Sequence, residues 1–143
     1  MTALLEKLWA SRFLRFAAVG GAGFFVNEAA LLFAKQILGA GDRLGWFIAF
    51  APAVTFTWWG NRKLTFAEHA SEGHRGMLAE WARFVLTNSL GAAANFIVYA
   101  TLIAHAPWPL DVAYVALAIG ILVGLVFNFT LSKRLVFRKG MRH

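Results

Sequence analysis

Two pairs of adjacent cations are the residues in this chain best suited to chemistry. Each pair directly follows a long apolar segment, and a further Arg stands at the start of an apolar segment in each half of the chain. The cations concerned are Arg15, Arg62, Lys63, Arg83, Lys133 and Arg134. Guanidinium groups bind phosphate oxygens through two parallel hydrogen bonds, and basic pockets between helix ends bind lipid head groups. The spacing predicts a phosphate or lipid head-group site, although such clusters can also serve only to orient a membrane protein.

Polar side chains inside the apolar segments form a second candidate group. Glu28 lies about 12 residues into the first segment, where a charge near the bilayer centre costs about 2.5–3.5 kcal/mol or more, so a functional role is the default hypothesis. The alternative is a protonated, structural Glu. Helical spacing places Asn88 and Asn95 on one face, which either packs against a helix or lines a polar groove. The predicted groove residues are Asn27, Glu28, Asn88, Asn95 and Asn128.

Aromatic residues accompany the cation pairs. Trp58, Trp59 and Phe129 stand three to five residues before them. Aromatic side chains at this position usually anchor a helix at the membrane surface. They also offer a face against which a sugar ring or an isoprenoid chain can lie.

Signatures of catalysis are missing from the sequence. There is no Cys, no glycine-rich phosphate loop, no His-Glu-x-x-His helix and no cluster of metal ligands, and the four His are isolated. We therefore predict no catalytic site, no metal and no cofactor, and a protein that is not an enzyme. The net charge of +7 does not indicate nucleic-acid binding, because the cations flank apolar segments.

Composition indicates the fold class, an all-α membrane protein. Hydrophobic residues make up 59% of the chain and charged residues 15%, against about 25% in soluble domains. Four transmembrane helices are predicted within a single domain, 1–143, and a short amphipathic helix over residues 1–12. Pro52 predicts a kink or break in the second helix, and a polar linker, 61–80, joins the two halves. The four predicted spans are 16–38, 44–60, 84–104 and 112–132.

The four helices form two parallel two-helix repeats. The ends Asn61–Phe66 and Asn128–Phe137 align with an offset of 71 positions at Phe66 and Phe137, and Arg15-Phe16 aligns with Arg83-Phe84 at an offset of 68. The repeats cover about 12–66 and 80–138. The N-terminal arm, central linker and tail hold 12 of the 14 Lys and Arg, so the positive-inside rule places both termini in the cytoplasm.

These motifs resemble the GtrA-like family. The resemblance rests on Arg15-Phe16 with Val19-Gly20-Gly21, and on the repeated helix ends, and it covers about residues 12–138. The second end has Asn128-Phe129 where the first has Thr57-Trp58. The resemblance implies a flippase of the bacterial inner membrane that moves sugars linked to a polyprenyl phosphate, such as undecaprenyl phosphate, for cell-surface polysaccharide synthesis. It also implies membrane lipid and a membrane glycosyltransferase as partners.

Two other functions fit the same sequence. A small proton-coupled exporter also has four helices with an acid in the first, but the strong charge bias here favours one fixed orientation. A scaffold that recruits a glycosyltransferase without transport is the other alternative. We also predict a homo-oligomer, because one four-helix unit leaves little room to shield a head group.

Overall fold

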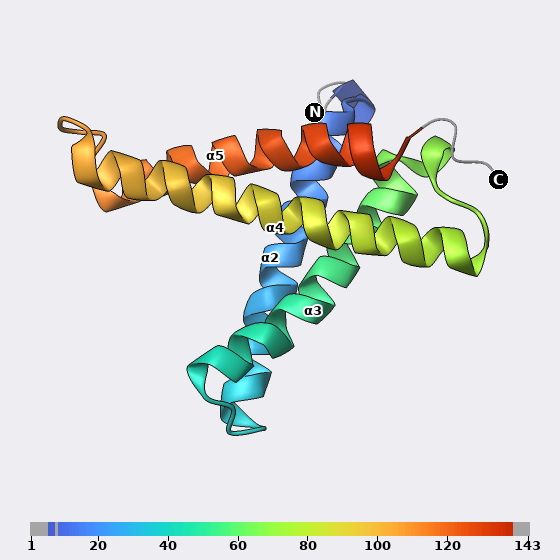
Figure 1. Ribbon diagram of the computed structural model, residues 1–143, viewed down its shortest axis with the longest axis horizontal. Coiled ribbons are helices and arrows are strands. Elements are labelled where there is room, and N and C mark those ends of the chain that lie inside the picture. The colour runs from blue at the N-terminus through green and yellow to red at the C-terminus, as the bar shows by residue number, and fades with distance from the viewer. Residues whose placement is uncertain (1–5, 8, 139–143) are drawn as a thin grey trace. The chain divides into compact units, whose positions relative to one another are not determined.

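The computed structural model describes residues 6, 7 and 9–138, and in this part of the chain it is helical with no strand. Four long helices confirm the predicted all-α fold (Figure 1). They are α2 (Arg12–Gln36), α3 (Asp42–Gly60), α4 (Gly73–His105) and α5 (Ala113–Leu131). The amphipathic helix predicted over residues 1–12 falls largely outside the described residues. The described residues Glu6, Lys7, Trp9 and Ala10 are helical.

Length and composition allow three of these helices to cross a membrane: α2, α4, and α5 with the turn that follows it. The remaining long helix, α3, has 19 residues, of which Asp42 and Arg43 form the start, and this lowers its mean hydropathy. It runs unbroken through Pro52, so of the predicted kink or break the break is absent and the kink stays a prediction.

The prediction of a polar linker over residues 61–80 was wrong for residues 73–80, which belong to a helix. Helix α4 begins at Gly73, eleven residues before the predicted span, and its 33 residues extend about 50 Å, well beyond a hydrocarbon core of about 30 Å. Residues 77–80 are Met-Leu-Ala-Glu, all strong helix formers. Because polarity alone does not stop a helix, α4 continues past the apolar segment.

The chain forms two compact units, residues 1–73 and 74–143, and each is a helical hairpin. In the first hairpin α2 and α3 lie side by side, and in the second α4 and α5 do so (Figure 1). Gly39, at a φ of +63°, ends α2 in the left-handed conformation. The N–H groups of Leu38 and Ala40 then bond the carbonyls of Phe33 and Ala34 at 3.3 and 2.9 Å. The second hairpin turns at 106–112, with a cis peptide before Pro109.

Small residues let the two helices of each hairpin approach closely. Gly23 of α2 faces Thr57 of α3, and the residues at the equivalent places of the second hairpin, Gly91 and Asn128, face each other in the same way. A methyl group added at either glycine would overlap the facing side chain. Both glycines are buried. This contact is the one expected of small residues at a membrane helix interface.

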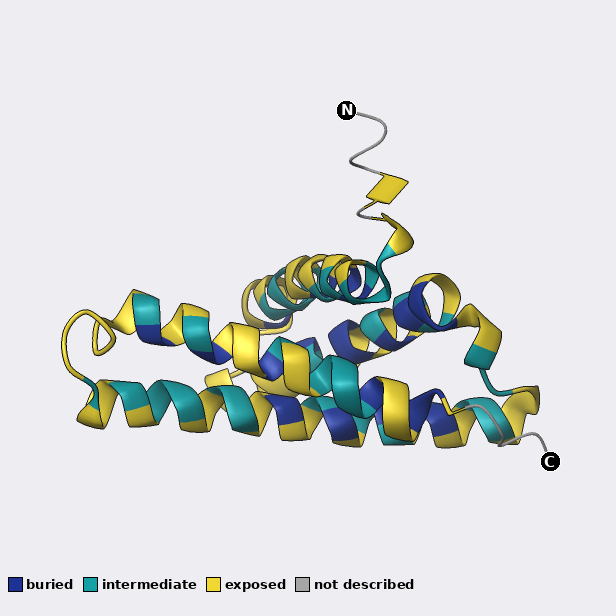
Figure 2. Cartoon of the chain, turned by 90° about the horizontal axis from the view of Figure 1, so that it is seen from above, coloured by how far each residue is buried: buried dark blue, intermediate teal, exposed yellow. Residues whose placement is uncertain are grey.

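Large apolar side chains are exposed along the helices. Phe25 of α2 is 72% exposed and Phe96 of α4 is 68% exposed. Exposed positions alternate with buried ones along every helix, so each helix keeps one packed stripe and one open face (Figure 2). An apolar open face of this kind suits contact with lipid.

The close contact of Gly120 with the backbone of α4 generates a prediction. A Cβ at this position would lie 2.9 Å from the backbone carbonyl oxygen of Asn95 and would overlap its side chain. Gly120→Ala should therefore separate α4 from α5 and lower stability by about 1–3 kcal/mol. Thermal unfolding of the purified protein in detergent measures this effect.

Gly21→Ala is the matched control, because no atom lies within 4 Å of a Cβ at that position. It should be neutral or slightly stabilising, since Ala is the better helix former. Equal melting temperatures for the two variants would contradict the close packing at Gly120.

Candidate functional site

Each hairpin finishes in one turn of π-helix at its open end, which is defined here as the end opposite the loop that joins its two helices. These turns are η1 (Asn61–Thr65) after α3 and η3 (Ser132–Val136) after α5. The N–H of Phe66 bonds the carbonyl of Asn61 at 2.8 Å, and the N–H of Phe137 bonds that of Ser132 at 2.9 Å. The wider turn of a π-helix brings its first residue and the residues four and five positions later onto one face.

The residues on that face are buried, and they are the same positions in both hairpins. In the first they are Asn61, Thr65 and Phe66, and the Thr65 hydroxyl donates to the side-chain oxygen of Asn61 at 2.8 Å. In the second they are Ser132, Val136 and Phe137. The open ends therefore share one backbone with different polar side chains.

An aromatic pair ties each open end to the first helix of its hairpin. Phe66 meets Phe16 with ring centroids 6.3 Å apart and an interplanar angle of 67°. Phe137 meets Phe84 at the same 6.3 Å, with an angle of 64°. Edge-to-face pairs of this geometry contribute about 0.5–1.5 kcal/mol beyond the area they bury. The distance and angle are nearly the same in the two pairs, so the sequence repeat is also a repeat in structure.

The paired cations are on the part of each turn that faces away from the aromatic pair. Arg62 donates to the backbone oxygen of Ser71 at 2.6 Å, and its guanidinium lies 5.9 Å from the centre of the Trp58 ring. The Lys63 ammonium lies 4.9 Å from the Trp59 ring. The two tryptophans are thus neighbours of the cations, as cation–π partners.

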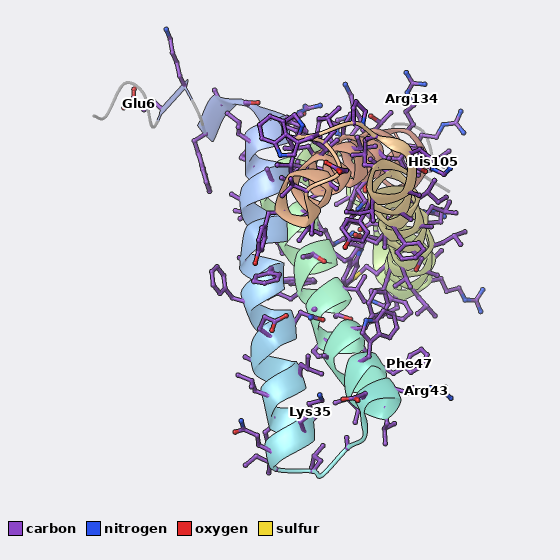
Figure 3. The ribbon with its side chains drawn as sticks, turned by 90° about the vertical axis from the view of Figure 1, so that its left-hand side faces the viewer. Glu6, Lys35, Arg43, Phe47, His105 and Arg134 are labelled. Atoms are coloured by element: carbon purple, nitrogen blue, oxygen red, sulfur yellow. The ribbon has the colours of Figure 1, made fainter. Side chains whose placement is uncertain are left out.

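The two adjacent cations of the second hairpin are more exposed than Arg62 of the first. Lys133 and Arg134 are both exposed, and Figure 3 shows Arg134. The aligned positions also carry opposite choices of cation, since Arg62 corresponds to Lys133 and Lys63 to Arg134. Phe129 occupies the place of Trp58. The hydrogen bond to Ser71 fixes the Arg62 side chain, whereas Arg134 is exposed and accessible to a ligand.

Arg15 and Arg83 occupy equivalent places near the open ends. The Nε atom of each is buried and makes no hydrogen bond to any residue that the structure describes. A buried donor without an acceptor costs about 1–3 kcal/mol. A ligand oxygen that reached either donor would remove that cost.

The asparagines of the second hairpin lie in its interface. Asn128 donates to Asn88 at 3.3 Å across α4 and α5, and Asn95 packs against Gly120 and Gly124. The remaining hydrogen-bonding atoms of the first pair, Asn88 Nδ2 and Asn128 Oδ1, are buried and make no hydrogen bond in the described part of the chain. The contact geometry therefore gives these residues a packing role, and the groove stays a prediction.

The other two predicted groove residues belong to the first hairpin. Asn27 and Glu28 are half-buried near the middle of α2, and Glu28 forms no ion pair with a described residue. Lys35, seven residues on, pairs with Asp42 across the loop end of the hairpin, where Figure 3 shows it. Glu28 is thus separated from the nearest cation of its own helix.

Four residues near the open ends were missed by sequence reasoning. Arg12 pairs with Glu68 at 3.0 Å, Arg12 and His69 line a small hollow with Arg15, and Glu80 is fully buried. Arg12 and Arg15 are three residues apart, a spacing that places them on one helix face. The repeat could have pointed to Glu80, because the offset of 68 positions aligns Glu80 with Arg12. The residues that the structure describes include no cluster of three potential metal ligands among His, Cys, Asp and Glu.

Comparison with known families gives one match. The family model described as GtrA/DPMS, transmembrane domain, matches residues 15–137 and so includes both hairpins with both open ends. No curated protein matches the chain.

The aromatic pairs generate a prediction for both hairpins. Phe66 and Phe137 are each 2% exposed, so Phe66→Ala and Phe137→Ala should each lower stability by about 3–5 kcal/mol. Thermal unfolding in detergent measures the loss. Leu64→Ala and Leu135→Ala are matched controls, because these neighbours are 45% and 46% exposed and should change little. A loss at only one of the two Phe positions would mean that the hairpins are not energetically equivalent.

Proposed function

Because the chain belongs to the GtrA/DPMS transmembrane-domain family, we propose that it moves polyprenyl-phosphate-linked sugars across the bacterial inner membrane. The sugars would then serve cell-surface polysaccharide synthesis. The chain is a multi-pass membrane protein, and members of this family are generally non-catalytic. The proposed activity is accordingly translocation without a chemical step.

The observation that carries the proposal is the open end that occurs twice. Each combines a buried aromatic pair, a π-helix turn and two adjacent cations. Orientation in the membrane needs only positive charge at these places. It does not need the same unusual turn in both hairpins, and such turns are frequent at functional sites. A head group with a phosphate is the ligand that this arrangement suits.

Each part of a lipid-linked sugar has a matching feature in the chain. At the first open end a phosphate suits the exposed Lys63 and the buried donor of Arg15. At the second it suits the exposed Lys133 and Arg134 and the buried donor of Arg83. The prenyl tail can stay in lipid, against the apolar outer faces of the helices. The sugar needs polar partners inside the hydrocarbon, for which Asn27 and Glu28 are the accessible candidates.

The hairpin topology supports one orientation. A hairpin that crosses the membrane twice begins and ends at the same surface, so the second hairpin starts where the first finishes. Both open ends would then face the cytoplasm, in agreement with the positive-inside rule. We propose that a homo-oligomer shields the head group and that a membrane glycosyltransferase receives the sugar.

Reconstitution tests the proposed function. Proteoliposomes that contain the purified protein and a fluorescent polyprenyl-phosphate sugar should show the lipid becoming accessible to a membrane-impermeant quencher on the opposite leaflet. Protein-free liposomes are the control. No acceleration over that control would reject translocation and favour the scaffold, whereas transport that stops when a proton gradient is collapsed would favour a proton-coupled mechanism.

The exposed cations generate a further prediction. Arg134→Lys keeps the charge but loses the planar donor pair that binds phosphate, so affinity for the lipid-linked sugar should fall about tenfold, or by about 1–2 kcal/mol. Binding to protein in nanodiscs measures this change. Arg75→Lys, an exposed position in the first turn of α4, is the matched control and should bind normally. Arg62→Lys is less informative because its guanidinium also holds Ser71. Unchanged affinity in Arg134→Lys would reduce this cation to a membrane anchor.

A further inference from the structure

A small hollow lies at the open end of the first hairpin. Its volume is about 70 Å³, and it lies between the first turn of α2 and residues 64–69. Arg12 and Arg15 line one side and His69 the other. The hollow is formed by a single unit of the chain, so its lining does not depend on the second hairpin.

Two of the three nitrogen-bearing side chains around the hollow have unused hydrogen-bonding capacity. Arg15 Nε and His69 Nδ1 are buried, and neither makes a hydrogen bond with the described part of the chain. Buried polar atoms are normally paired, so each such atom calls for an explanation. Both residues line the hollow, so a shift of their side chains would bring the Arg15 donor to a ligand oxygen there, and His69 can donate to the same ligand from a protonated nitrogen.

The third side chain, Arg12, has a partner that a ligand can replace. Its guanidinium donates to Glu68 at 3.0 Å, and Glu68 itself lines the hollow. The two side chains are 39% and 77% exposed. An ion pair this exposed contributes little to stability, because water and salt screen it. Glu68 is therefore a weakly held carboxylate at the mouth of a cationic hollow.

We infer that this hollow is an anion subsite that takes a phosphate group, with Glu68 occupying Arg12 until the phosphate displaces it. The carboxylate and the phosphate offer the same chemistry to Arg12, namely paired oxygens for a guanidinium fork. The phosphate additionally reaches Arg15. The inference deepens the proposed function, since it rests on that function for the source of the phosphate, a lipid head group.

The subsite belongs to one hairpin only. Arg15 has its counterpart in Arg83, whose Nε is buried and makes no hydrogen bond among the described residues, but Arg12 is replaced by Glu80 at the aligned position. Glu80 is fully buried and offers an anion no guanidinium donor, whereas Arg12 does. The two open ends thus share a backbone but differ at this position, so the hollow with its two arginines belongs to the first, and the exposed cations Lys133 and Arg134 of the second are a separate candidate for head-group binding.

Substitutions on either side of the ion pair test the inference, because they should act in opposite directions. Glu68→Gln removes the competing carboxylate and should tighten phosphate binding roughly three- to fivefold, while Arg12→Gln should weaken it by at least as much. The probes are a short-chain polyprenyl monophosphate and inorganic phosphate, titrated separately into full-length protein in nanodiscs of neutral lipid. The readout is the Kd.

Matched controls come from neighbouring charges that lie outside the hollow. Glu72→Gln and Arg75→Gln change the same charges at exposed positions and should leave the Kd unchanged. Arg12→Lys keeps the charge and the ion pair, so it provides a folded variant if Arg12→Gln is unstable, and it should still bind more weakly than wild type. A melting curve for each variant confirms folding.

The outcomes distinguish a phosphate subsite from an ion pair that has only a structural role. Opposite shifts with both probes support the subsite and identify free phosphate as sufficient, and opposite shifts with the prenyl phosphate alone support it with a lipid head group as the ligand. Shifts of the same sign, or none, overturn the subsite and leave a structural ion pair. The liposome transport measurement is independent: transport with no shift rejects only the subsite, and opposite shifts without transport reject only the proposed translocation.

Discussion

The hydrogen bond that spans five residues at each open end is the interaction on which the rest of the structure depends. A helix that leaves a membrane must keep its backbone groups paired while the chain changes direction. The bonds from Phe66 to Asn61 and from Phe137 to Ser132 meet this need and widen the last turn. The widening turns one Phe inward against the first helix and leaves two cations on the opposite side.

The same backbone carries different polar chemistry in the two hairpins. At the buried positions of the turn, Asn61 and Thr65 bond each other in the first, while Ser132 and Val136 stand there in the second. Within the interface, Thr57 meets Gly23 where Asn128 meets Gly91. The packing shapes are conserved between the repeats, whereas the charges and hydrogen-bonding groups differ.

Close packing and ligand access use separate surfaces of each hairpin. Glycine and asparagine occupy the helix interfaces, where a single added methyl group would overlap a neighbour. Cations, tryptophans and the small hollow gather at the open ends, where the helices leave the apolar segment. A head group can therefore interact at an open end without separating the helices.

The sequence by itself determined the helical fold, the repeat and the placement of the cations. Long apolar segments can only be helices in a membrane, and the offsets between Phe16 and Phe84 and between Phe66 and Phe137 align residues that make the same contact. It did not determine where α4 begins, because the predicted span started at the apolar segment, whereas residues 77–80 are strong helix formers that extend the helix toward Gly73. Only the tertiary structure decided that Asn88 bonds Asn128, that Arg62 is tied to Ser71 and that Arg12 meets Glu68. The first and last of these join side chains 40 and 56 positions apart, which meet only after the helices have packed. The Arg62 bond depends on how the segment after α3 folds back, which the sequence pattern does not show.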